Sequence, residues 1–131
     1  MVLRTIELCA GYGGMSLGLR IAYPAARTVC YVEREAFPAA VLVQAMEQGR
    51  LDPAPIWSDL ATFDGKPWRG VVDLVTAGFP CQPWSVAGRR GCEDDERYSG
   101  VWPQIARIVG ECRPSLVFLE NVSLDAFRGP R

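Results

Sequence analysis

The chain has 131 residues, which is enough for one compact domain and too few for two ordinary ones. Apolar residues make up 49% of it and charged residues 22%, and the formal net charge of −1 gives no overall indication of a nucleic-acid ligand. No apolar run approaches the roughly 20 residues of a membrane-spanning helix. The first residues also lack the charged-then-apolar layout of a signal peptide. We therefore expect a cytoplasmic protein with no membrane partner.

The cysteine and histidine content limits the chemistry. The chain has five cysteines with no Cys-x-x-Cys pair, and it has no histidine. A structural zinc ion needs four well-spaced cysteine or histidine ligands, so we expect no metal site. A two-cysteine redox centre is disfavoured for the same reason. Catalysis is therefore expected to use cysteine and carboxylate groups.

Strand-like and helical segments alternate along the chain. A strand over 3–9 is followed by a helix over 15–22, a strand over 28–32 and a helix over 36–48. The second helix carries Phe37, Val41 and Ala45 on its apolar stripe.

The second half of the chain continues this pattern. Brief strand-like sequence at 56–57 and a clearer strand over 71–76 precede a long irregular stretch, 78–100, of the kind that is usually functional or disordered. Pro114 ends a third helix, whose apolar face is formed by Ile105, Ile108, Val109 and Cys112. A last strand covers 116–119. This alternation predicts one α/β domain with a doubly wound parallel sheet of at most five strands.

Glycines follow the first strand directly, in Cys9-Ala10-Gly11-Tyr12-Gly13-Gly14. Glycines between a strand and a helix let a ligand approach the backbone closely, and the helix start offers free N–H groups. The segment does not match a dinucleotide fingerprint, because Ser16 stands where the third glycine belongs. A nucleotide-type ligand and an ordinary turn both remain open from these residues.

Carboxylates follow the second and third strands. Glu33 lies twenty positions beyond Gly13, where a doubly wound fold places an acid that accepts hydrogen bonds from a ribose diol. Asp59 follows the third strand and is a candidate acceptor for an adenine amino group, with Leu60 packing on the ring. The simpler alternatives are a solvated strand-end acid for Glu33 and a turn cap for Asp59. Taken together, the two acids favour an adenosine pocket.

A cysteine and a glutamate follow the last two strands. Cys81 lies in Gly78-Phe79-Pro80-Cys81-Gln82-Pro83-Trp84-Ser85, in a polar loop stiffened by prolines rather than in an apolar stripe. Glu120 is expected to leave a buried strand as a candidate acid, the alternative being an ordinary strand-end carboxylate. Adjacent parallel strands lie about 4.8 Å apart, so both groups can reach one small substrate.

In this order, these blocks resemble the C5-cytosine DNA methyltransferase family from about Thr5 to Val122. The resemblance implies a Rossmann-like fold that binds S-adenosylmethionine (AdoMet), truncated here to about the first five strands of a mostly parallel sheet. It further implies AdoMet contacts by residues of the glycine-rich turn, the acid loops and the two ends of the catalytic loop: Cys9, Gly11, Gly13, Gly14, Glu33, Arg34, Asp59, Leu60, Pro80 and Val101.

The reaction implied by the resemblance is methyl transfer to C5 of a cytosine flipped out of double-stranded DNA. The Cys81 thiolate adds to C6 and makes C5 nucleophilic, while Glu120, in the Glu120-Asn121-Val122 motif, bonds the base at N3 and the exocyclic amine. Side chains of the catalytic loop are implied to face the DNA: Gln82, Ser85, Arg89, Arg90 and Arg97.

Two kinds of departure from the family pattern matter. Cys9 stands where the family usually has an aromatic residue near the cofactor, and Arg34 stands where a bulky apolar side chain often covers the adenine. The target recognition domain and the C-terminal motifs are absent, so we expect activity to require a complementing C-terminal half. The alternatives are an inactive remnant or subunit that binds AdoMet or a partner chain, and a tRNA cytosine-5 methyltransferase.

Overall fold

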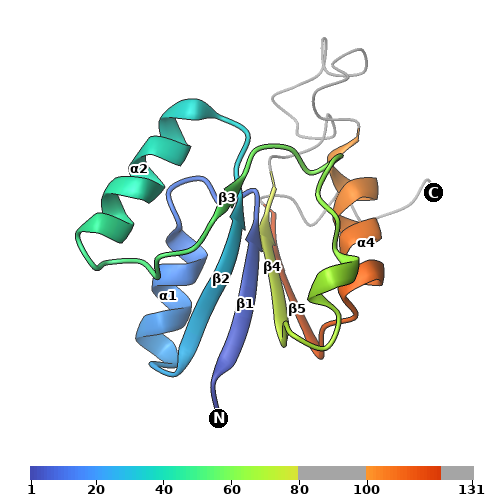
Figure 1. Cartoon of the computed structure of the whole chain (residues 1–131), viewed down its shortest axis with the longest axis horizontal. Coiled ribbons are helices and arrows are strands. Elements are labelled where there is room, and N and C mark those ends of the chain that lie inside the picture. The colour runs from blue at the N-terminus through green and yellow to red at the C-terminus, as the bar shows by residue number, and fades with distance from the viewer. Residues whose placement is uncertain (80–99, 122–131) are drawn as a thin grey trace, which may run out of the picture.

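A computed structural model describes residues 1–79 and 100–121 and shows a five-stranded parallel sheet within them (Figure 1). The strand order is β3-β2-β1-β4-β5, and every neighbouring pair is parallel. The strands are β1 (Leu3–Leu8), β2 (Ala26–Val32), β3 (Ile56–Trp57), β4 (Leu74–Gly78) and β5 (Leu116–Glu120). The predicted order of elements and the predicted parallel α/β sheet are confirmed.

Helices cover both faces of the sheet. Helices α1 (Gly14–Ala22) and α2 (Ala36–Glu47) lie on one side, and α4 (Val101–Cys112) lies on the other, beside the segment that contains the short 3₁₀ helix η1 (Lys66–Trp68) (Figure 1). No helix in residues 1–79 and 100–121 is long and apolar enough to cross a membrane.

The hydrophobic core lies mainly between the sheet and α4. Successive strand residues point to opposite faces, so Ile6 and Leu8 face α4 while Thr5 and Glu7 face α1. Ile105 and Ile108 of α4 are fully buried against Ile6 and Leu8 and their neighbours. A smaller cluster on the other face packs residues of α2 against β2 and contains Ala10, Tyr31, Leu42, Ala45 and Leu51.

Two local predictions are wrong in part. Strand β4 begins at Leu74 rather than Val71, because the N–H groups of Val71 and Val72 donate to Trp68 O in a turn that follows η1. The buried residues of α2 are Leu42 and Ala45, whereas Phe37 is exposed. The predicted end of α4 is confirmed: Cys112 is its last residue, and Arg113, before Pro114, leaves the right-handed helical region with left-handed backbone (φ 49°, ψ 55°).

Strand β5 is exposed along its whole length, so the expectation that Glu120 leaves a buried strand is also wrong. The pairing of Val75 with Val117 places Val117 on the α4 face, and Phe118, its neighbour, on the α1 face. Phe118 retains 57% of its accessible surface and Val117 retains 44%. Within the described residues, β5 pairs with β4 alone and forms an apolar edge of the sheet.

Candidate active site

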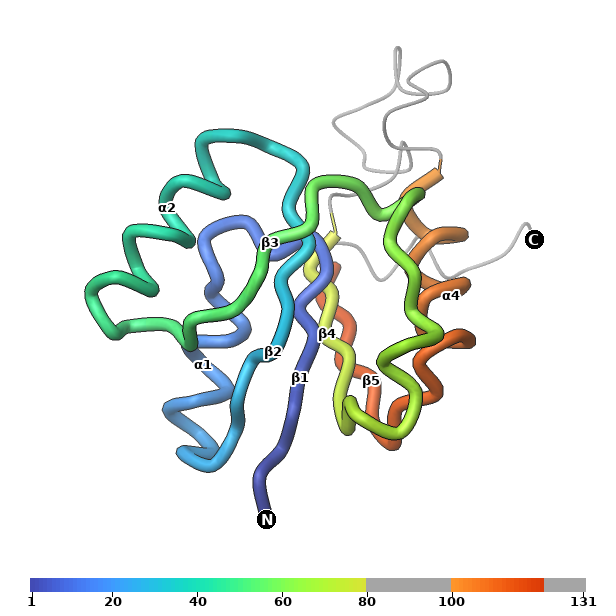
Figure 2. The backbone as a smooth tube through the Cα atoms, viewed as in Figure 1, coloured from blue at the N-terminus to red at the C-terminus, as the bar shows by residue number. Residues whose placement is uncertain are grey.

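The carboxyl ends of all five strands meet at one edge of the sheet. Val32 pairs with both Leu8 and Trp57, and Leu8 pairs with Ala77, so the chain leaves β1, β2, β3 and β4 in one row. Ala77 in turn pairs with Leu119 of β5. Figure 2 shows the turns after β1, β2 and β3 gathered at this edge. The structure therefore brings together the segments in which the sequence predicts functional residues.

The turn after β1 has left-handed backbone at every second residue. The φ angles are +52° at Cys9, +54° at Gly11 and +77° at Gly13. A β-carbon at Gly13 would lie 2.5 Å from Leu51 Cδ1 and 3.0 Å from Leu42 Cδ2. Glycine is required at position 13 both by its backbone angle and by this close approach to the core.

Glu33 is held against this turn by two backbone N–H groups. Gly11 N donates to its Oε2 at 2.7 Å, and Glu35 N donates to its Oε1 at 2.7 Å. The residue is 9% exposed. Each carboxylate oxygen accepts one of these bonds and keeps further acceptor capacity. The structure thus connects the predicted acid with the predicted glycine-rich turn in one rigid unit.

Glu7 is a buried acid whose role the sequence analysis missed. It is 1% exposed, and its Oε2 accepts hydrogen bonds from the backbone N–H and the hydroxyl group of Ser16, at the start of α1. Thr28 donates to the Ser16 hydroxyl at 2.8 Å, and Thr5 and Thr28 share a hydrogen bond of 3.1 Å. Burial raises the pKa of Glu7, and the bonds to Ser16 partly oppose that rise.

The contacts of the Ser16 hydroxyl group explain why this position has serine rather than the glycine of the dinucleotide fingerprint. Its hydroxyl group links Glu7 to Thr28, so a glycine at this position would leave two buried polar side chains without their shared partner. The spacing between Glu7 and Ser16 carries no motif that would have predicted this contact.

Asp59 lies in a tight turn after β3. Its Oδ1 accepts from Ala61 N at 2.8 Å, which is the turn-capping geometry weighed as the simpler alternative. Its Oδ2 makes no hydrogen bond with residues 1–79 or 100–121, and the side chain is exposed. Leu60 is half-buried against the core beneath α4. One oxygen of Asp59 thus shapes the turn while the other faces outward.

The two residues that depart from the family pattern have different surroundings. Arg34 is exposed, and its guanidinium group makes no hydrogen bond or ion pair with the described part of the chain. Cys9 is half-buried, and burial, together with the nearby charge of Glu33, raises the pKa of its thiol to about 12. Cys9 is therefore a neutral thiol near pH 7 and a poor nucleophile.

Glu120 lies beside the end of β4. It pairs with Gly78, and a β-carbon at Gly78 would lie 3.5 Å from Glu120 Oε2 and 2.6 Å from Met15 Cε. The Glu120 carboxylate is therefore close to the backbone three residues before Cys81. Phe79 and Trp102 pack with ring centroids 5.8 Å apart, which joins the end of β4 to the start of α4.

Several predicted residues fall outside the described ranges. These are the proposed nucleophile, one cofactor contact and all of the proposed DNA contacts: Cys81, Pro80, Gln82, Ser85, Arg89, Arg90 and Arg97. Val101 is described, begins α4 and packs against the core. Among residues 1–79 and 100–121, no cluster of three or more cysteine, aspartate or glutamate side chains has the arrangement of a metal site.

The strand order of this chain and the solved structures that align with it define the class of the fold. The Dnmt2 methyltransferase of S. pombe aligns with a TM-score of 0.66 at 23% identity, over 94% of this chain and 35% of that one. The fold is Rossmann-like, of the kind found in AdoMet-dependent methyltransferases. The predicted fold class is confirmed.

The chain belongs to the C-5 cytosine-specific DNA methylase family, whose sequence profile matches residues 3–124. The type II methyltransferase M.CviJI of Paramecium bursaria Chlorella virus IL3A is 37% identical over 92% of this chain and 30% of its own length. M.NgoMIV of Neisseria gonorrhoeae is 37% identical over 93% of this chain and 36% of its own length. The chain thus spans about a third of the length of these curated relatives.

Proposed function

We propose that this chain is the AdoMet-binding and catalytic-loop part of a DNA (cytosine-5-)-methyltransferase. The observation that carries the proposal is the position of two acids at one edge of the sheet. Glu33 is held by Gly11 at the end of β2, and Glu120 lies beside Gly78 at the end of β5. The first is suited to bind a cofactor and the second to bind a base that stands next to Cys81.

The donor and acceptor groups of the site fit AdoMet. Glu33 keeps acceptor capacity for the two hydroxyl groups of a ribose, and Asp59 Oδ2 faces outward as an acceptor for the adenine amino group. Leu60 offers an apolar side chain beside it. The left-handed turn at Gly11 and Gly13 lets the cofactor approach the backbone. Cys9, Gly14, Arg34, Pro80 and Val101 are proposed to complete the pocket.

In the proposed mechanism, Cys81 Sγ forms a bond to C6 of the extruded cytosine. The electron pair of the C5–C6 double bond shifts to C5 and is delocalised through C4 onto N3, where a hydrogen bond from the Glu120 side chain stabilises it. AdoMet, when bound, supplies the methyl group that C5 takes up. A water molecule then takes the C5 proton, the electron pair of the C5–H bond re-forms the C5–C6 double bond, and the bond between C6 and Sγ breaks to release the thiolate and the product. Gln82, Ser85, Arg89, Arg90 and Arg97 are proposed to contact the DNA around the flipped base.

A complementing polypeptide is part of the proposal. The curated relatives are about three times as long as this chain, and β5 exposes apolar side chains on both faces at the edge of the sheet. An open strand of this kind is a template for pairing with another chain. We propose that the further polypeptide of a complete enzyme covers β5.

Covalent trapping tests the function. DNA that carries 5-fluorocytosine cannot lose its C5 substituent as a proton, so the proposed mechanism predicts a stable adduct between the chain and the DNA. The chain is mixed with AdoMet, this DNA and the M.NgoMIV polypeptide that lies outside the matched region. The adduct is measured by denaturing electrophoresis, and tRNA carrying the same base serves as the competing substrate.

The expected adduct forms with the wild-type chain on DNA and is lost in Cys81→Ser. Glu120→Gln should slow its formation by about 10²-fold, the size typical of a lost transition-state contact, with little change in AdoMet affinity. An adduct with Cys81→Ser contradicts the mechanism, and an adduct confined to tRNA contradicts the proposed substrate.

A further inference from the structure

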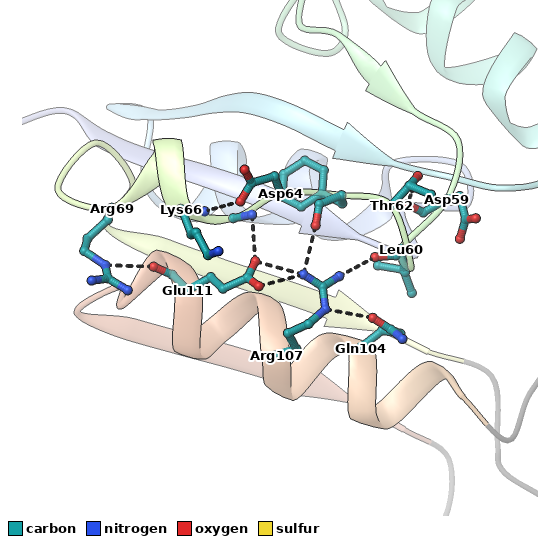
Figure 3. A network of polar contacts seen from close by, with 11 residues as sticks. Asp59, Leu60, Thr62, Asp64, Lys66, Arg69, Gln104, Arg107 and Glu111 are labelled. Carbon is teal, nitrogen blue, oxygen red and sulfur yellow. Dashed lines mark hydrogen bonds and ion pairs between the residues drawn. The ribbon is translucent and has the colours of Figure 1, made fainter.

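Arg107 of α4 forms hydrogen bonds with the turn that carries Asp59 and Leu60. Arg107 Nη2 donates to Leu60 O at 2.7 Å, and its Nη1 donates to Phe63 O at 3.0 Å. Its Nε donates to Gln104 Oε1 at 2.8 Å, which directs the side chain along the helix. Figure 3 shows the guanidinium group between α4 and this turn. The planar group thus binds two carbonyl oxygens of the turn at once.

Glu111, one helical turn further along α4, strengthens this attachment. It forms an ion pair of 2.8 Å with Arg107 and accepts from Gly65 N at 2.9 Å. The Gly65 N–H and then Arg107 lower the pKa of Glu111. The approach is close, since a β-carbon at Gly65 would lie 2.9 Å from Glu111 Cβ. Segment 60–65 is therefore attached to α4 at both of its ends.

Asp59 depends on this attachment through the turn itself. Asp59 O accepts from Phe63 N at 3.1 Å and from Thr62 N at 3.3 Å, so Asp59 moves with the residues that Arg107 holds. Trp57 Nε1 donates to Thr62 Oγ1 at 3.0 Å from the strand side, but Trp57 is itself 46% exposed. The Phe63 side chain is buried in the core and anchors the far end of the turn. Among the described residues, Arg107 supplies the hydrogen bonds that join the backbone of this turn to α4.

We propose that Arg107 is a positioning residue for recognition of the cofactor's adenine ring. It holds Asp59 and Leu60 where they select adenine. The proposal rests on the cofactor site proposed above. It predicts an effect that is specific to the adenine ring, because Glu33 and the glycine-rich turn bind the rest of the nucleoside and do not contact Arg107.

Two ligands isolate this effect in the full 131-residue chain. S-adenosylhomocysteine carries the adenine amino group, and S-inosylhomocysteine carries an oxygen in its place. A hydrogen bond to a charged group is worth about 1.5–3 kcal/mol, so the wild-type chain should prefer the adenosyl ligand by at least about tenfold. Isothermal titration calorimetry measures both Kd values.

Arg107→Ala should reduce this preference to within about threefold, mainly by weakening the adenosyl ligand by about tenfold. Asp59→Ala should give the same pattern, and the double variant should lose no more than either single variant. Arg107→Lys keeps the positive charge near Glu111 but lacks the planar fork, so it should also lose most of the preference.

Arg69→Ala is the matched control. Arg69 also attaches η1 to α4, by donating to Glu111 O at 2.9 Å, but it does not bond the 59–63 turn. This variant should keep the full preference for adenine. Thermal unfolding of every variant shows whether it is folded, and hydrogen exchange of Ala61–Phe63 should rise in Arg107→Ala and Arg107→Lys but not in Arg69→Ala.

Each outcome separates the two proposals. If the wild-type chain binds neither ligand, the proposed cofactor site is wrong and this inference falls with it. If the wild type binds and prefers the adenosyl ligand, but Arg107→Ala weakens both ligands equally or neither, the positioning role is wrong and the cofactor site stands. Full preference in Arg107→Lys would also overturn the inference, since charge alone would then suffice.

Discussion

Glu7 and Glu33 are two acids near the ends of neighbouring strands. Glu33 lies at the edge of the sheet, whereas Glu7 is buried beneath a helix. Glu33 binds the N–H groups of Gly11 and Glu35 at the sheet edge, where a ligand can reach it. Glu7 points beneath α1 into a network of hydroxyl groups and is 1% exposed. The first acid is the one that we propose binds the cofactor, and the second fixes the start of the helix that follows the glycine-rich turn.

The raised pKa of Glu7 predicts a pH dependence of stability. Because the folded-state pKa lies above the ordinary value of 4.5, the stability associated with this group is fully present below pH 4.5 and is lost as the pH rises through the folded-state pKa. Glu7→Gln keeps the shape and hydrogen-bonding capacity of the side chain and removes the titration. The free energy of unfolding of the wild type should therefore fall relative to Glu7→Gln as the pH rises above 4.5.

Urea unfolding of the wild type and Glu7→Gln over this pH range measures the difference between their free energies of unfolding. The titration of all other groups is common to both proteins and cancels in this difference. A difference that stays constant with pH would show that the pKa of Glu7 is the same in the folded and unfolded states.

At the scale of elements, α4 has several structural roles. Its buried face, with Ile105 and Ile108, packs on the sheet, and Arg107 and Glu111 hold the turn after β3. Its first residue, Val101, follows the predicted catalytic loop closely in the sequence. Its end at Arg113 is left-handed and donates a capping N–H to Val109 O at 2.9 Å. The helix therefore links the proposed adenine site to the proposed catalytic site.

The left-handed conformation of Arg113 predicts a stabilising substitution. A residue with a β-carbon is strained there, and glycine is the preferred residue at this position after a helix. Arg113→Gly should raise the free energy of unfolding by about 0.5–1 kcal/mol, measured by chemical denaturation.

Gly49 provides the reverse control. Its φ is +69°, and a β-carbon there would contact nothing within 4 Å, so Gly49→Ala tests the backbone conformation alone. This variant should lose about 1 kcal/mol. If Arg113→Gly and Gly49→Ala shift stability in the same direction, backbone strain is not what limits stability at these positions.

At the scale of the whole molecule, the two sides of the sheet differ in how far their apolar residues are covered within the described residues. The β2 and β3 side is covered by α2 and the chain that follows it, whereas β5 exposes Leu116, Val117, Phe118 and Leu119. Such an edge invites pairing with another polypeptide. The proposed cofactor-binding residues thus lie within this chain, and the exposed apolar edge is where we propose that a further polypeptide binds.

This open edge predicts self-association of the isolated chain. Phe118→Lys places a charge on the exposed edge and should reduce the concentration-dependent association that sedimentation velocity detects. The same variant should also weaken adduct formation with the complementing polypeptide.

Val43→Lys introduces the same charge at a residue of α2 that is 45% exposed and lies away from β5. It should leave association unchanged. Equal effects of the two variants would show that net charge, rather than the β5 edge, controls association.

The amino-acid sequence by itself determined the order of elements, the parallel sheet and the family. These depend on local patterns: apolar runs, the glycines after β1, and motifs at the ends of successive strands. Because parallel strands end at one edge, their spacing also predicted that Glu33, Asp59 and Glu120 would lie along a common edge.

Only the tertiary structure decided which groups meet across the fold. The contact of Glu7 with Ser16 and Thr28, and that of Arg107 with Leu60 and Phe63, join residues from separate elements at spacings that follow no local period. The exposure of β5 likewise depends on what stands beside it, since its apolar sequence is the same whether it is covered or open. Local sequence carries the period of a helix or strand, but burial and long-range hydrogen bonds arise from packing.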